Sequence, residues 1–384
     1  MSGLLKIFPR HLRDQHPLDK YVLWIALVLS AVGIMAVYSA IAFLAEVKAG
    51  GDTELFLVRH SLRVGLALIA LTVFSMVDYH HLARWSRFFL IGSLLLLVFV
   101  RIFGVTYGGA TRAFHVGMLS VQPSDLAKIS LILYIAVLLV RKQTYIQSFS
   151  RTFLPLSLWI FATVGLIGLE DVSTAFLVLV SVMLMAFVGR FSLPYIGSMG
   201  AIAVIFAALL LLGSPNRAQR LESYFGVKIF PHSEEVETFS VQAEGYQARQ
   251  AHIALAMGGL TGRGPGKSVQ RDFLPAPYND FIFAIITEEY GLLGGVALLT
   301  LFVVLLFRGF LRIARHATDP LGLFIAVGCT VILTLYGFVH TGVAVGLLPV
   351  TGLPLPLVSY GGTSMISAGT LLGILLNISR QIER

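Results

Sequence analysis

Apolar blocks long enough to cross a lipid bilayer recur along nearly the whole chain. A membrane-spanning helix needs about 20 mostly apolar residues. About ten blocks meet this requirement, at roughly 21–45, 61–77, 84–103, 123–140, 152–169, 173–189, 193–213, 281–307, 320–346 and 357–378. Only 12% of the 384 residues are charged, about half the usual share in a soluble chain. The sequence therefore predicts an all-α polytopic membrane protein with about ten transmembrane helices.

The first 20 residues are polar and basic, and the apolar run that follows them extends to Ala45. A cleaved signal peptide has a much shorter apolar core of about 7–15 residues. We therefore expect a cytoplasmic tail, 1–20, followed by a retained first helix. With no internal linker or strong repeat, the chain is interpreted as a single membrane domain, 1–384. The single cysteine, Cys329, excludes an intrachain disulfide.

Lys and Arg residues are unevenly distributed between the connecting segments. If the N-terminus is cytoplasmic, the short segments on the outside hold only Lys48, Arg59, Arg63, Arg101 and Arg112, and the other short segments hold many more. The positive-inside rule then predicts that both termini are cytoplasmic and that the one long loop, 214–279, is extracytoplasmic. We attribute the net charge of +8 to this topology and to contact with anionic lipids, and we expect no nucleic acid partner.

The second half of the long loop has two distinctive stretches. Residues Tyr246–Gly259 place apolar and polar positions at helical spacing and end in glycines, which predicts an amphipathic helix on the membrane face. Residues Gly262–Ser268 then read Gly-Arg-Gly-Pro-Gly-Lys-Ser. This resembles a nucleotide-binding loop, but Thr261 replaces the first glycine and no strand precedes it, so we expect no nucleotide. A loop that grips the phosphate of another ligand and a plain re-entrant turn both remain open.

Asp280 is the strongest lead to function. It lies where the polar stretch 275–280 runs into the apolar segment 281–289. An acid at this depth is costly unless it faces water, a cavity or a partner. Glu288 and Glu289 follow about 12–13 Å further along the helix. One interpretation is that one of them pairs with Lys128.

Other polar groups lie at membrane depth. Asp125 stands in the first turn of the fourth span, where helix capping is its alternative role, and Lys128 lies one turn deeper. Lys128 needs an acidic partner or an anionic ligand. Glu170 and Asp171 precede the sixth span. The apolar stretch 348–364 is broken by three prolines and several glycines, which is tolerated where the backbone is buried in protein or lines a cavity.

Four of these stretches together resemble one family. They are Gly108–Arg112, Gln122–Lys128, Leu274–Phe283 with Glu288–Gly291, and Gly352–Pro356 with Ser359–Ser364. In order and spacing they resemble the motifs of the shape, elongation, division and sporulation (SEDS) family, the polytopic peptidoglycan glycosyltransferases that include FtsW and RodA. The form of the last motif and of the 262–268 loop is more similar to the FtsW division branch.

The resemblance implies polymerisation of lipid II into glycan strands at the outer face of the bacterial cytoplasmic membrane, during septal or lateral wall synthesis. It makes Asp280 the candidate general base. The candidate substrate contacts are Arg112, Arg217, Arg220, Lys267, Gln270 and Ser359. Supporting roles are expected for Asp125, Lys128, Asp171, Glu288 and Glu289. A divalent cation, Mg²⁺ or Mn²⁺, is a candidate cofactor for the pyrophosphate, and its ligands are unknown.

The resemblance also implies partners: a class B penicillin-binding protein, which is a transpeptidase, and other division proteins. Three alternatives remain open, namely a lipid II flippase or other transporter, a RodA-type elongation polymerase, and a scaffold for division partners. A transporter favours charged residues near the bilayer midplane, whereas the informative residues here gather toward the outer side.

Overall fold

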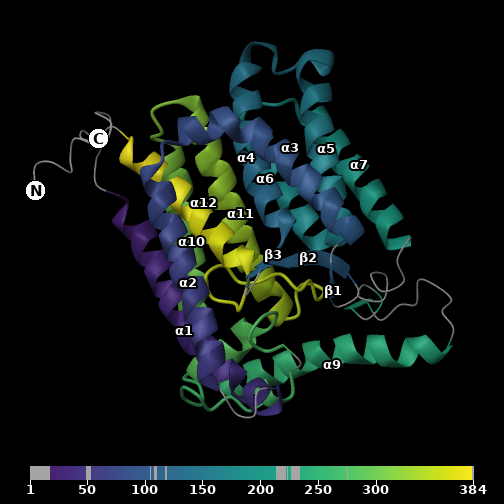
Figure 1. The fold of residues 1–384 in the computed structure, drawn as a ribbon, viewed down its shortest axis with the longest axis vertical. Coiled ribbons are helices and arrows are strands. Elements are labelled where there is room, and N and C mark those ends of the chain that lie inside the picture. The colour runs from purple at the N-terminus through teal and green to yellow at the C-terminus, as the bar shows by residue number, and fades with distance from the viewer. Residues whose placement is uncertain are drawn as a thin grey trace, which may run out of the picture.

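The computed structural model describes residues 18–48, 53–103, 105–107, 110–116, 119–212, 222, 224–225, 234–274 and 276–382. In these residues an elongated helical bundle is crossed at one end by a further helix, α9 (Glu234–Gly258) (Figure 1). The bundle consists of α1 (Lys20–Lys48), α2 (Thr53–Met76), α3 (Tyr79–Phe103), α4 (Pro123–Arg141), α5 (Leu154–Glu170), α6 (Val172–Val188), α7 (Leu193–Leu212), α10 (Ile282–Phe307), α11 (Pro320–Ala344) and α12 (Thr363–Arg380).

The expected all-α membrane architecture is confirmed. In the described part of the chain, eight helices are long and apolar enough to span a bilayer. The two other predicted spans correspond to α6, which has only 17 residues, and to α12, which begins at Thr363 instead of residue 357. The segment before Thr363 is irregular because its prolines and glycines do not support a helix. The number of spans remains a prediction.

The helices differ greatly in how much of their surface contacts protein. In the most apolar stretches of α4 and α11, 78% of the residues are buried, compared with 6% in α7. Helix α7 is apolar on all sides, as expected for a helix that faces lipid. Asp125 and Lys128 lie on α4, where protein surrounds them and the cost of burial can be offset by partners.

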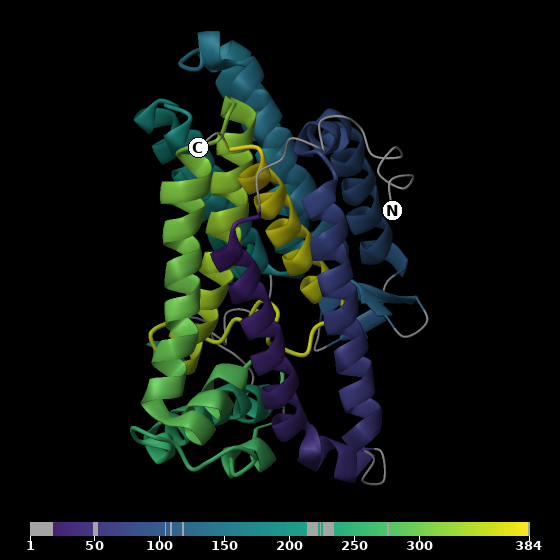
Figure 2. The ribbon, with the colours of Figure 1, turned by 90° about the vertical axis from the view of Figure 1, so that its left-hand side faces the viewer.

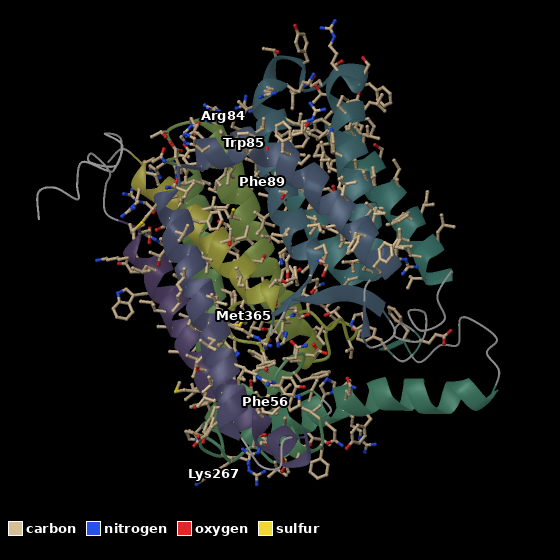
Figure 3. The ribbon with its side chains drawn as sticks, viewed as in Figure 1. Phe56, Arg84, Trp85, Phe89, Lys267 and Met365 are labelled. Carbon is tan, nitrogen blue, oxygen red and sulfur yellow. The ribbon has the colours of Figure 1, made fainter. Side chains whose placement is uncertain are left out.

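The beginning and the end of the described chain lie at the same end of the bundle. The backbone N–H of Asp19 donates to Ser379 Oγ (3.2 Å), and Arg308, after α10, forms an ion pair with the Asp19 carboxylate. Asn377 on α12 donates to the Ser75 carbonyl at the end of α2 (3.0 Å). Figure 3 places Arg84 toward this end and Lys267 at the opposite end. The first residues of α2 therefore lie at the end remote from the chain termini (Figure 2).

A small sheet, which the sequence analysis did not predict, lies between α3 and α4. Its strands are β1 (Val105–Tyr107), β2 (Ala110–Val116) and β3 (Leu119–Val121), all antiparallel in the order β1-β2-β3. The backbone of Arg112 lies on β2. Short strands between glycines give little periodic signal, so the segment reads as a plain loop in sequence.

Helix α9 confirms the predicted helix in the long loop, and it begins earlier than Tyr246. Ala251, Ala254 and Gly258 form its buried side, and α9 packs against α10. Its expected position on the membrane face remains a prediction.

The loop 259–268 docks onto a break in α10. Gly291 has a left-handed φ of 70°, and the helix resumes after it. Because the break frees backbone groups on both sides, the loop bonds to them in both directions. The bonds are Leu292 N to Gly259 O (2.8 Å), Leu293 N to Leu260 O (3.2 Å), Arg263 N to Glu288 O (3.0 Å) and Gly264 N to Glu289 O (2.9 Å). Of the two interpretations left open for this loop, the structure favours the re-entrant turn.

Candidate active site

The irregular segment 349–362 folds against the polar stretch that precedes α10. The N–H of Tyr360 donates to the Tyr278 carbonyl (2.9 Å), and Ser359 Oγ donates to the Asn279 carbonyl (2.8 Å) while accepting from the N–H of Leu355 (2.8 Å). These bonds satisfy backbone groups that no helix or sheet satisfies at this depth. They also fix the two motifs, about 80 residues apart in sequence, against each other.

Asp280 lies at this junction, immediately before Phe281, the N-cap residue of α10. It is half-buried. Its carboxylate faces Gly352, whose φ is +68°: a Cβ placed on Gly352 would lie 3.8 Å from Asp280 Oδ2 and 4.0 Å from Oδ1. A glycine suits this position for two reasons, because it adopts a positive φ without strain and because it leaves space beside the carboxylate.

His340 on α11 anchors the residue next to Gly352. Its Nδ1 lies 2.7 Å from the Leu353 carbonyl, which fixes Nδ1 as the protonated nitrogen in that bond. His340 is 1% exposed. The position of the Gly352 turn against Asp280 therefore depends on α11 as well as on α10.

Lys128 pairs with Asp125, one turn before it on α4. The Nζ–Oδ1 distance is 2.7 Å, and both side chains are almost fully buried. Thr363 Oγ1 donates to the other carboxylate oxygen (2.8 Å), and Lys128 Nζ lies 4.7 Å from the centroid of the Tyr336 ring. The interpretation that Lys128 pairs with Glu288 or Glu289 is therefore wrong. The i, i+3 spacing of Asp125 and Lys128 allows a local pair, so neither distant carboxylate is needed.

This ion pair borders a cavity of about 360 Å³, counted to its open mouth. The cavity lies between α4, α11, α12 and the segment 349–362, and its lining includes Lys128, Tyr336, Ser359, Ser364 and Met365. Met365 is labelled in Figure 3, at the beginning of α12 and between the two ends of the molecule. The half-buried carboxylate and the buried cation thus lie on opposite sides of one irregular segment.

Comparison with known proteins places this arrangement in a family. Residues 19–384 match a family model described as cell cycle protein and named for FtsW, RodA and SpoVE. The chain belongs to this family.

Similar proteins and structures agree with this assignment. The chain is 36% identical over 366 residues to stage V sporulation protein E of Bacillus subtilis (94% of this chain, 97% of that protein), and 35% identical over 370 residues to the probable peptidoglycan glycosyltransferase FtsW of Geobacter sp. strain M18 (95% and 97%). It is also similar to a chain of a peptidoglycan synthase complex that coordinates polymerization and crosslinking (TM-score 0.74, 27% identity, 94% and 98% covered). The rod shape determining protein RodA of Thermus thermophilus gives a TM-score of 0.68 at 25% identity, with 96% and 98% covered. The SEDS resemblance is confirmed.

Asp171, at the beginning of α6, caps that helix. Asp171 Oδ1 accepts hydrogen bonds from the N–H groups of Ser173 (2.9 Å) and Thr174 (3.2 Å), and Oδ2 accepts from Thr174 Oγ1 (3.1 Å). Tyr336 Oη, beside Lys128, lies 3.5 Å from Thr174 Oγ1. Asp171 is therefore connected to the Asp125–Lys128 pair through Thr174 and Tyr336, and its supporting role remains a prediction.

Glu288 and Glu289 bind the 262–270 loop. Glu288 accepts from Ser268 Oγ (2.5 Å), from the N–H of Val269 (3.0 Å) and from the N–H of Gln270 (3.2 Å), and Arg263 lies 3.6 Å away. Glu289 accepts from Ser39 Oγ on α1. The loop amides that could have held a phosphate thus hold a carboxylate of the same chain.

The predicted substrate contacts are placed very differently. Gln270 and Ser359 are buried, at 5% and 1% exposure. Ser359 Oγ is bonded to backbone groups of the protein, and the backbone N–H of Gln270 donates to Glu288. Their substrate roles remain predictions. Lys267 is exposed at the end of the molecule remote from the termini (Figure 3). Arg217, Arg220 and the side chain of Arg112 lie outside the described part of the structure. The roles of Lys267, Arg112, Arg217 and Arg220 remain predictions.

The donor set for a metal ion is limited. Within the described residues, no three His, Cys, Asp or Glu side chains are grouped as metal ligands. The residues present therefore do not define a divalent-cation site, and no step below depends on one.

Sequence reasoning missed several residues at the junction. Gly352 was noted only as part of the motif Gly352–Pro356, His340 stands in an otherwise apolar stretch, and Arg59 and Arg63 were counted only as outside charges. A signal was present for the arginines, since two cations spaced i, i+4 on an apolar helix lie on one face.

Proposed function

We propose that this chain is a peptidoglycan glycosyltransferase that polymerises lipid II at the outer face of the cytoplasmic membrane, with Asp280 as general base. The observation that carries the proposal is the half-buried Asp280 carboxylate held against Gly352. It stands in a chain similar to proteins named peptidoglycan glycosyltransferase FtsW.

The reaction joins two sugars and releases the pyrophosphate from the anomeric carbon of the donor. Asp280 takes the proton of the acceptor 4-hydroxyl as its oxygen attacks the anomeric carbon of the donor. The new O4–C1 bond forms while the bond from C1 to the pyrophosphate oxygen breaks, and undecaprenyl pyrophosphate leaves with that electron pair. A half-buried carboxylate in its ionised form can accept this proton.

The cavity bordered by Lys128 supports this assignment indirectly. The buried Asp125–Lys128 pair fixes the N-terminal turn of α4 against Thr363 and thereby the end of the segment that carries Gly352. A rigid support of this kind keeps a catalytic group in position.

The test is glycan synthesis by the purified full-length chain from lipid II, with products resolved by gel electrophoresis. Asp280→Asn keeps the size of the side chain and removes the base, so we expect synthesis to fall by at least about 100-fold. The matched control is Asp272→Asn, an exposed acid in the same outer segment, which should leave synthesis unchanged. A folded Asp280→Asn protein that polymerises at a near-normal rate would remove Asp280 from the chemistry. Loss of lipid II flipping with polymerisation intact would favour a transporter.

The division branch is the better-supported role, because several similar proteins are named FtsW. A similar structure is part of a complex that coordinates polymerization and crosslinking. This supports a class B penicillin-binding protein as partner, with other division proteins in the same assembly. Co-expression with the matching transpeptidase should yield a complex or change polymerase activity. If no complex forms and the activity does not change, that partner is rejected.

The charge distribution supports cytoplasmic termini, and the contact of Asp19 with Ser379 supports a common side for both. A cysteine introduced at Glu235 should react with an impermeant thiol reagent in intact cells once Cys329 is replaced. Labelling only after permeabilisation would reverse the topology.

A further inference from the structure

Two arginines lie near the end of α2 that is remote from the termini. Arg59 and Arg63 are one helical turn apart, and both are half-buried. Among the described residues, the ion pairs include neither of them, and the Nε of Arg59 is buried without a hydrogen-bond partner. Two like charges at this spacing repel each other, so an anion between them would lower the free energy of the site.

Tyr360 connects these arginines to the candidate active site. The guanidinium carbon of Arg63 lies 4.3 Å from the centroid of the Tyr360 ring, at cation–π distance. His60, which is fully buried, stacks on the same ring at 5.5 Å, and Tyr278 meets it edge-on at 5.5 Å. The contacts with His60 on α2 and with Tyr278 before α10 hold the Tyr360 ring in place.

Tyr278 stands two residues before Asp280, and the N–H of Tyr360 bonds to the Tyr278 carbonyl. The segment that carries Tyr360 also carries Gly352, which faces the Asp280 carboxylate. The cations of α2 and the carboxylate before α10 are therefore attached to the same short segment. A substrate that reaches Asp280 from the lipid side meets Arg59 and Arg63 close by.

We propose that Arg59 and Arg63 form the subsite that binds the diphosphate of the lipid-linked substrate, an inference that rests on the proposed function. Planar guanidinium groups bind phosphate oxygens in a bidentate manner. Residues four apart on a helix have Cβ atoms about 5–6 Å apart, so each arginine can take one of two adjacent phosphates. Cations placed at the leaving group stabilise the charge that develops as its bond to C1 breaks.

The experiment measures binding without turnover. The full-length Asp280→Asn protein in detergent is titrated with undecaprenyl pyrophosphate, undecaprenol and dioleoyl phosphatidylglycerol, and binding is followed by native mass spectrometry. Arg59→Gln with Arg63→Gln is compared with Arg249→Gln, an exposed arginine on α9. Arg63→Lys, which keeps the charge and loses the planar fork, serves as a second variant, and thermal unfolding without ligand checks that each variant folds.

We expect the double variant to bind undecaprenyl pyrophosphate at least about 10-fold more weakly, since hydrogen bonds to charged groups contribute more than the free energy of one decade. Undecaprenol binding should not change, Arg63→Lys should be intermediate, and Arg249→Gln should match the parent. Pyrophosphate binding within about twofold of the parent, an equal loss for undecaprenol, or an equal loss for phosphatidylglycerol would each overturn the subsite. The last would make the arginines a general contact for lipid headgroups. If the wild type polymerises lipid II and the double variant binds undecaprenyl pyrophosphate as well as the parent, the subsite alone is rejected. If the wild type binds undecaprenyl pyrophosphate but does not polymerise lipid II, the proposed function is rejected.

Discussion

Two carboxylates eight residues apart at the beginning of α10 have opposite surroundings. Glu288 is fully buried and receives hydrogen bonds from a hydroxyl and two backbone amides, all supplied by the 262–270 loop. Asp280 is half-buried and faces a glycine that leaves space beside it. A glycine-containing segment contacts each carboxylate. The 262–270 loop gives Glu288 hydrogen-bond donors, whereas Gly352 presents no side chain to Asp280. A carboxylate bound in the first way stabilises the fold, and one placed in the second way can meet a substrate.

The largest effect on stability is expected from Lys128→Ala. Its partner Asp125, like Glu288, is a buried carboxylate bound within the protein. The change leaves Asp125 buried without its cation, and breaking such a pair costs about 3–5 kcal/mol of unfolding free energy. Thermal unfolding in detergent would measure it, with Lys142→Ala at the end of the same helix as the control. A variant as stable as the parent would show that the pair is not structural.

A smaller loss is expected from Glu288→Ala, at about 3 kcal/mol, because the Ser268 hydroxyl and two amides lose a charged acceptor. Glu288→Gln should recover part of this loss, since its amide oxygen still accepts. The exposed Glu54 supplies the control, Glu54→Ala. If Glu288→Ala were stable and instead lost polymerisation as completely as Asp280→Asn, the distinction between the two carboxylates would fail.

The smallest change in stability, with a clear loss of activity, is expected from Gly352→Ala. A left-handed φ costs a non-glycine residue about 1–2 kcal/mol, and the added Cβ would lie in van der Waals contact with the Asp280 carboxylate. We expect glycan synthesis to fall by about 10-fold or more, because small displacements at a catalytic group have large effects. Comparison with Gly266→Ala, also at positive φ but with open space around its Cβ, separates backbone strain from crowding of Asp280.

The sequence singled out candidate site residues more readily than it predicted their contacts. Asp280 stood out because an acid beside an apolar helix is costly, and the structure places it at the junction of two motifs. The pairing assigned to Lys128 was wrong because a distant carboxylate was preferred over the one three residues away. Ser359 was chosen as a substrate contact, and its Oγ makes hydrogen bonds to backbone groups of the protein. The substrate roles of Ser359 and Gln270 remain predictions.

The sequence by itself determined the helices, their class and the charge bias between the two sides. It could do so because a bilayer requires every spanning segment to satisfy its own backbone and to be apolar over a fixed length, which are local constraints. Only the tertiary structure decided which groups each carboxylate meets, because these groups are distant in sequence. Thr363 reaches Asp125 across 238 positions, and Arg63 reaches Tyr360 from the other end of the chain. No periodicity records such contacts, since they depend on how α2, α4, α10 and α12 pack together.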